Sequence, residues 1–338
     1  YLEWGQKPIA TWYHKNYFDK RIDYSIDISW RIPPIQNYIK NVNRSSRAIK
    51  LTIRLCGALN YNRDGHRFDM GIETKYSNVS YLQSHLQKCI RKGKEDIALA
   101  TAKHLIRLDI LTFLRRILII IIEDVRLHES FPVILWLMVA KSNQESFEFS
   151  RDMLEWLLGV VYMLCKHPHY YGHPCSEENT ILVNDIIPSW KLLLKMNKQK
   201  NNLCTLVYAL IMRMSFGGLH GDMRMLIHLS HDIAFKRQSY ELVINDLIRR
   251  IIWEVDDLPH NRWDLDAIDF HVMPRLPYWI SKKYPQYSEE EIKKMMWTYS
   301  SSLNWRISKN DHGSEGYRKW HAILPRVRYL QRKRILHA

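Results

Sequence analysis

The stretch "YLQSHLQKCIRKGKEDIALATAKHLIRLDILTFLRRILIIIIEDVRL", Tyr81 to Leu127, carries the strongest helical pattern in the chain. Gly93 follows its first apolar series, where a glycine that ends a helix is expected. Two further helices are predicted, one from about Asp96 to Leu108 and one beginning near Asp109. The first apolar series recurs every four residues, at Leu82, Leu86 and Ile90.

The helical pattern continues towards the C-terminus in segments such as "FPVILWLMVAKS" and "SRDMLEWLLGVVYMLCK". The segment "SEEEIKKMMWTY" begins with Ser288 and has Glu291 three residues later, which is the spacing of a capping box. The first 75 residues are poorly periodic, and "RAIKLTIRLCGAL" fits a strand or a helix. We favour a helix there, because nothing nearby supplies a second convincing strand. The predicted fold is all-α, a multi-helix bundle.

Three regions are predicted along the 338 residues. Residues 1–75 form an irregular aromatic and basic segment, residues 76–255 a helical domain, and residues 256–338 a C-terminal helical region with a basic tail. A hydrophobic content of 46% allows a sizeable core. The apolar runs are far shorter than the roughly 18 residues of a membrane span, so no span is predicted.

Composition bears on partners and compartment. Fifty Lys and Arg against 35 Asp and Glu give a net charge of +15. This surplus would attract nucleic acid, an anionic membrane face or an acidic protein. The five cysteines are irregularly spaced, which favours a reducing, intracellular compartment over a disulfide framework. The nucleus, or a viral replication site for a viral protein, fits that expectation.

The segment "SHLQKCIRKGKEDIALATAKHLIRLDILTFLRRILIIIIEDV" resembles the C-terminal region of the replication-associated recombination ATPases, the AAA+ family that includes the Werner-helicase-interacting protein. The resemblance implies a clamp-loader-collar-like helical domain that mediates oligomer contacts. It covers about 60 of the 338 residues. The matching residues are Ser84, Gln87, Lys88, Ile90, Arg91, Ala100, Leu105, Arg115, Arg116, Glu123, Asp124, Val125 and Leu127.

The chain departs from that family where the ATPase chemistry would be. The Gly93-Lys94 pair lacks the upstream glycine and the following hydroxyl of a phosphate-binding loop. Arg126 stands where the family usually has a glycine. The resemblance therefore implies the helical domain without the ATPase. Three other segments, "MSFGGLHGDMRML", "IDFHVMPRLPYW" and "MMWTYSSSLNWR", look like parts of uncharacterised proteins of large DNA viruses.

Glu123 and Asp124 directly follow the apolar run Ile117 to Ile122. Arg115 and Arg116 precede them by about two helical turns, near the same face. We predict a structural Arg-carboxylate brace, and the alternative is a catalytic or metal-binding acidic pair.

The segment "CKHPHYYGHPC" gathers residue types that bind zinc. Its spacing matches no common zinc module, so an aromatic and histidine-rich loop is the preferred interpretation and structural zinc the alternative. No other cofactor is predicted. The zinc candidates are Cys165, His167, His169, His173 and Cys175.

Two further clusters could suggest metal chemistry. His228 and His231 in "HLSHD" are spaced for one helix face, but edge-of-core histidines explain them better. The acidic stretch "WEVDDLPHNRWDLDAIDFH" could serve a two-metal nuclease. Helix capping and pairing with basic residues explain its acids better.

The last 21 residues hold seven Lys or Arg and no Asp or Glu. Among these cations stand the aromatic residues Trp320 and Tyr329. Cations neutralise phosphates and aromatic rings stack on unpaired bases, so this tail is the predicted nucleic-acid-binding site. A solvated helix face is the alternative. The predicted residues are Arg318, Lys319, Trp320, Arg326, Arg328, Arg332, Lys333 and Arg334.

The sequence has no nucleophile elbow, kinase signature, dinucleotide fingerprint or HExxH motif, and no catalytic residue is predicted. We therefore expect a non-enzymatic protein that binds nucleic acid in replication, repair or genome handling and associates with itself or with partner proteins. The first alternative is a structural or scaffold subunit of a larger assembly, for example a viral one. The second is a metal-dependent nuclease.

Overall fold

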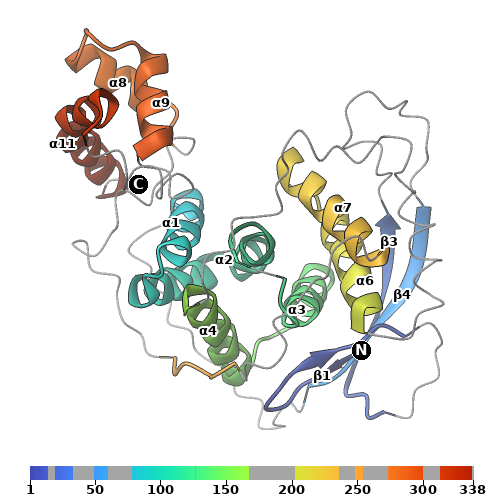
Figure 1. Cartoon of the computed structure of the whole chain (residues 1–338). Coiled ribbons are helices and arrows are strands. Elements are labelled where there is room, and N and C mark those ends of the chain that lie inside the picture. Colours follow the sequence, from blue (N-terminus) through green and yellow to red (C-terminus); the bar gives the residue numbers. More distant parts are fainter. Residues whose placement is uncertain are drawn as a thin grey trace. The chain divides into compact units, whose positions relative to one another are not determined.

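The computed structural model describes residues 1–13, 20–32, 49–59, 78–125, 127–166, 202–235, 248–253, 273–299 and 313–336 (Figure 1). These residues are mostly helical, as predicted, but they also include a four-stranded sheet. The chain forms two compact units. The sheet unit comprises Tyr1–Arg67, Leu118–Ser150 and Tyr170–Ile248, and the helical unit comprises Phe68–Ile117, Arg151–His169 and Arg249–Ala338.

The sheet has the strand order β2-β1-β4-β3. Its long hairpin-like pair is β3 with β4, antiparallel from Tyr24 opposite Gly57 to Ile32 opposite Ile49. The short β1 pairs antiparallel with β2 and parallel with β4. The strands are β1 Leu2–Glu3, β2 Ile9–Ala10, β3 Tyr24–Ile32 and β4 Ile49–Ala58.

The prediction of a helix over the β4 segment is wrong, and with it the all-α prediction for the N-terminal region. The missing partner strand is β3, in which buried Ile28, Trp30 and Ile32 alternate with exposed residues. On the exposed side, Arg54 of β4 donates to both carboxylate oxygens of Asp27 in β3, at 2.7 and 3.1 Å. These cross-strand pairs, not local periodicity, determine the strand.

Three helices lie entirely within the sheet unit: α3 Phe131–Asn143, α6 Asn202–Ser215 and α7 His220–Phe235. Helix α3 contacts β2 and α6, and α6 contacts β3 and α7 (Figure 1). The Trp136 indole of α3 donates to the Cys56 carbonyl of β4 at 3.1 Å. The Trp30 indole of β3 donates to the Ser215 hydroxyl at the end of α6, also at 3.1 Å. Tryptophan N–H groups thus fix both helices to the strands.

Helices α6 and α7 form a hairpin whose turn needs glycine. Gly217 and Gly218 both have positive φ angles, 72° and 151°, which side chains with a Cβ rarely adopt. The guanidinium of Arg213 donates to the Gly217 carbonyl at 2.8 Å, which satisfies a backbone acceptor at the end of α6.

Helix α2 (Glu95–Asp124) contains the predicted break near Asp109. The Asp109 backbone is extended, with φ −159° and ψ 89°. Its carboxylate accepts from the Thr112 amide at 2.9 Å and from the Thr112 hydroxyl at 2.6 Å. Asp109 therefore acts as an internal N-cap that restarts the helix.

In the helical unit, α1 (Val79–Arg91) contacts α4 (Arg151–Lys166). Asn78 caps α1 by accepting from the Tyr81 amide at 3.1 Å. The helix ends as predicted at Gly93, whose φ of 63° is the left-handed conformation of a C-terminal glycine.

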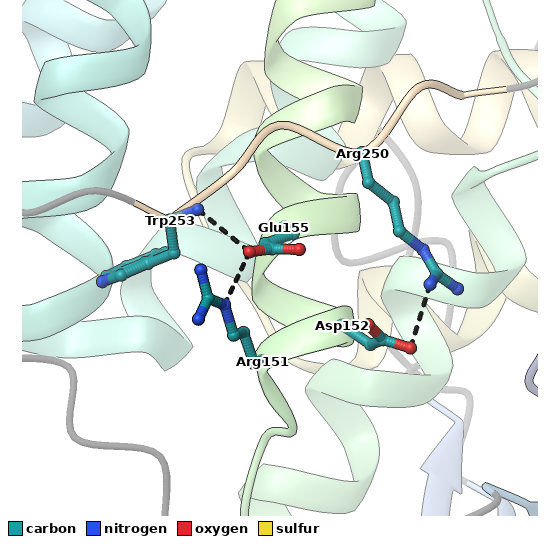
Figure 2. A network of polar contacts seen from close by, with 5 residues as sticks. All are labelled: Arg151, Asp152, Glu155, Arg250 and Trp253. Carbon is teal, nitrogen blue, oxygen red and sulfur yellow. Dashed lines mark hydrogen bonds and ion pairs between the residues drawn. The ribbon is translucent and has the colours of Figure 1, made fainter.

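An extended segment, residues 248–253, lies along α4 (Figure 2). The Glu155 carboxylate accepts from the Trp253 amide at 3.1 Å and from Arg151 at 2.8 Å. The Glu155 carbonyl accepts from the Ile251 amide at 3.1 Å, and Arg250 pairs with Asp152 at 2.9 Å. Trp253 is buried, so the segment is held by apolar as well as polar contacts.

The C-terminal helix trio consists of α8 Leu276–Lys283, α9 Glu289–Tyr299 and α11 Glu315–Leu336. Each of the three helices contacts the other two. The predicted capping box of α9 is confirmed: Ser288 N donates to Glu291 at 2.8 Å, and Glu291 N donates to Ser288 Oγ at 3.2 Å. The trio has a small core of its own, which includes Leu276, Ile280, Ile292, Met296, Trp320, Ile323 and Val327.

None of the helices that the structure describes combines the length and the apolar character needed to cross a membrane.

Candidate nucleic-acid interface

Helix α11 presents most of its cations on the side away from its buried residues. All seven of its Lys and Arg side chains are exposed or partly exposed. Successive residues of an α-helix are about 100° apart, so six of these positions fall on one broad face. The seventh, Arg334, falls on the side of the buried residues, where it contacts Trp279 of α8. We call the six the cationic face, which comprises Arg318, Lys319, Arg326, Arg328, Arg332 and Lys333.

The opposite face of α11 is buried in the helix trio. Its buried residues are Trp320, Ile323, Leu324, Val327 and Gln331. Because burial orients the helix, the cations on the other side point to solvent. The exposure of these cations is therefore a consequence of how α11 packs in the trio.

Trp320 is part of the predicted site, but the structure places it in the core. Its side chain is only 3% exposed, and its ring is stacked near that of Tyr299, with centroids 6.4 Å apart. A ring in this position has no free face for a base. The structure thus places the seven predicted cations at the surface. It places Trp320 in the core of the trio, where the ring stabilises the packing of α11.

Tyr329, the other aromatic residue noted in the predicted tail, is the exposed ring of this face. It is 55% exposed, and the guanidinium of Arg326 lies 5.0 Å from its ring centroid. Tyr329 follows Trp320 by nine residues, which is two and a half turns and hence the opposite side of the helix. That spacing indicates from the sequence alone that only one of the two rings can face the core of the trio.

Nearly all charged residues of α11 are positively charged. Glu315 is the only acidic residue of α11, and it pairs with Lys319 at 2.6 Å. Lys319 lowers the pKa of Glu315, and Glu315 in turn raises the pKa of Lys319. Across residues 273–299 and 313–336 there are 12 Lys or Arg and 4 Asp or Glu, so the net charge is 12 − 4 = +8. More than half of the chain's surplus charge lies in this trio.

Aromatic rings and cations also meet elsewhere in the trio. The Arg334 guanidinium lies 4.8 Å from the ring centroid of Trp279 in α8. The Lys282 ammonium lies 5.2 Å from the ring centroid of exposed Tyr278, one turn before it in α8. Such contacts hold both the ring and the cation in place.

The four residues of the predicted brace, Arg115, Arg116, Glu123 and Asp124, all lie on α2. Asp124 is buried. Arg116 donates to the side-chain oxygen of Gln87 in α1 at 3.3 Å. The Arg-carboxylate contact itself stays a prediction.

Of the predicted zinc ligands, only Cys165 is among the described residues; His167, His169, His173 and Cys175 lie outside them. Cys165 is buried near the end of α4, and burial raises its thiol pKa to about 12. Within the described ranges, no group of three or more metal-binding side chains comes together. The zinc site stays a prediction.

Of the other two metal candidates, only the histidine pair lies among the described residues. His231 of α7 is fully buried and its ring lies beside Phe235, with centroids 5.8 Å apart. His228, one turn earlier, is partly exposed. The acidic stretch from Glu254 to His271 lies outside the described residues.

Comparison of the chain with known proteins finds no matching family model, no matching curated protein and no matching solved structure. The resemblance to the collar-like domain of the recombination ATPases stays a prediction.

Proposed function

We propose that this chain is a non-enzymatic protein that binds nucleic acid through the cationic face of α11 and acts in an assembly. The observation that supports this most strongly is the distribution of charge on α11, with six cations on the side away from a buried, mostly apolar face. A role in replication, repair or genome handling, and self-association or partner proteins, rest on the family resemblance alone.

The physical basis is release of counterions. Each Lys or Arg that neutralises a phosphate releases cations condensed on the nucleic acid, which favours binding at low salt. The cationic face needs no metal ion for this and no base-specific contact. Its affinity should therefore depend steeply on salt and weakly on sequence.

An acidic protein partner is the second candidate, as expected for a scaffold subunit. The exposed rings of Tyr278, Trp297 and Tyr329 would suit a protein interface as well as a base. Nucleic acid is preferred because the trio carries a net +8, and phosphates supply negative charge at regular spacing.

The test is a binding titration of full-length protein with labelled single-stranded and duplex oligonucleotides. The variant changes Arg328, Arg332 and Lys333 to Gln, all exposed, so that the buried side of α11 is untouched. A truncation before Arg318 would be less informative, since it would remove Trp320 and its neighbours from the core.

A matched control changes three exposed cations outside the trio, Arg31, Lys50 and Lys94, to Gln. Both triple variants lower the net charge by three. We expect the α11 variant to lose about 100-fold in affinity at about 0.1 M salt, and the control less than about threefold. Equal losses would show that net charge alone matters, and absence of binding by the unchanged protein at low salt would refute the proposal.

A further inference from the structure

We infer that the preferred ligand of the helix trio is single-stranded nucleic acid, with a base stacked on Tyr329 and its phosphates on the surrounding cations. This inference rests on the proposed function and specifies its ligand. The physical reason is that an unpaired base can stack on an exposed ring of a cationic helix face, whereas a base paired within a duplex cannot.

The surroundings of Tyr329 fit a stacking platform. The ring is held by the Arg326 guanidinium, 5.0 Å from its centroid, and still leaves 55% of the residue exposed. Arg332 and Lys333 follow it by three and four residues and are exposed on the same side of the helix. A base on the ring would thus have cations within one turn in both directions along α11.

The same combination recurs on the other two helices of the trio. In α8, exposed Tyr278 lies beside Lys282. In α9, exposed Trp297 follows Lys293 and Lys294 by four and three residues, a spacing that places them on neighbouring positions of the helix surface. Each helix of the trio therefore carries one exposed ring with a cation about one turn away.

Duplex and single strand differ in what they offer these rings. In a duplex the faces of the bases are stacked on one another, and a side chain reaches only base edges and the phosphate backbone. In a single strand the base faces are free, and stacking on an aromatic side chain adds to the attraction between cations and phosphates. Cations alone would serve both ligands, but exposed rings among the cations favour the single strand.

The experiment measures dissociation constants of full-length protein for labelled oligo(dT) and for a labelled duplex of equal length. Tyr329→Ala removes the ring and Tyr329→Phe keeps it. Tyr13→Ala is the matched control, because Tyr13 is an exposed tyrosine of the sheet unit. A labelled poly-glutamate peptide tests whether negative charge alone is sufficient.

We expect the unchanged protein to bind oligo(dT) more tightly than duplex. Tyr329→Ala should weaken oligo(dT) binding by about 5- to 100-fold and change duplex binding by less than about twofold. Tyr329→Phe and Tyr13→Ala should stay within about twofold of the unchanged protein on both ligands.

Five results would overturn the inference. If duplex binds more tightly, or if Tyr329→Ala leaves oligo(dT) binding unchanged or weakens both ligands equally, the ring does not stack on a base and only this inference fails. If neither nucleic acid binds at low salt, the proposed function fails as well. Tighter binding of poly-glutamate than of oligo(dT) would replace both with an acidic protein partner.

Discussion

Helices α3 and α11 use their surfaces in opposite ways. Every residue of α3 from Phe131 to Ala140 is buried, whichever side of the helix it lies on. Helix α11 buries one face and presents six cations on the other. Side chains that stabilise the fold and side chains available for binding are therefore separated between the two helices, and within α11 between its two faces. Mutations can test this separation.

The largest effect on stability is expected at Trp136 in α3. Its indole contacts the aromatic rings of Tyr24 and Phe147 and donates to the Cys56 carbonyl. Trp136→Ala should lower the free energy of unfolding by about 3–5 kcal/mol, because it leaves a cavity and removes that hydrogen bond. Tyr329→Ala on α11 should change it by less than about 0.5 kcal/mol. Urea denaturation measures the free energy of unfolding of both variants. Similar losses of stability in the two variants would refute the distinction between buried α3 and the exposed face of α11.

Two carboxylates of α4 allow the same comparison between a buried and an exposed side chain. The side chain of Glu155 is 14% exposed, and that of Asp152, in the same turn, is 56% exposed. Glu155→Ala should cost about 1–3 kcal/mol, because the Trp253 amide loses its acceptor. Asp152→Ala should cost about 0–1 kcal/mol. If urea denaturation gives the same loss for both variants, docking of residues 248–253 does not depend on Glu155.

A substitution of Trp320 tests whether the buried face of α11 contributes to stability and not to nucleic-acid binding. Trp320→Phe should lower the free energy of unfolding by about 1–2 kcal/mol, since it removes buried volume from the trio. Its affinity for oligo(dT) should stay within about twofold of the unchanged protein. Denaturation and binding are measured on the same sample. A tenfold loss of affinity without loss of stability would assign Trp320 to binding after all.

The smallest effect is expected at the capping box of α9, and it should depend on pH. Hydrogen bonds from the backbone amide and side chain of Ser288 lower the pKa of Glu291 below its ordinary value of 4.5. A carboxyl group with a lowered pKa stabilises the fold above its ordinary pKa and loses that contribution as the pH falls through the lowered value. The stability difference between the unchanged protein and Glu291→Gln should therefore shrink between about pH 7 and about pH 3. A constant difference would contradict the assignment.

Local signals in the sequence located helix ends well. Gly93 ends α1, Asp109 breaks α2, and Ser288 with Glu291 caps α9, each as predicted. These features involve residues within four positions of one another. Their physical causes, a left-handed glycine and side chains that accept from nearby amides, act over the same short range.

The sheet was missed, although the alternation of apolar and polar residues in β3 is itself a strand signal. Which strands pair, and in which register, depends on contacts between segments far apart in the sequence. Residues of β4 alternate only in part, and their partner β3 lies about 25 residues earlier. The two-residue β1 joins the same sheet beside the end of β4. No periodicity within one segment reveals such partners.

For the candidate interface, the charges and both aromatic residues were predicted, but not which of the two rings is exposed. A run of cations without acids is visible in the sequence whatever the helix orientation. Whether Trp320 or Tyr329 faces solvent depends on which face of α11 is buried. The nine-residue spacing between them and the apolar positions Ile323 and Val327 contain that information.

The most direct test of the central claim is the salt dependence of oligo(dT) binding, compared between the unchanged protein and the variant with Arg328, Arg332 and Lys333 changed to Gln. If these three cations contact phosphates, a plot of log affinity against log salt should be shallower by about two for the variant, at about 0.7 per contact. Parallel plots would show that the cationic face of α11 does not contact the nucleic acid.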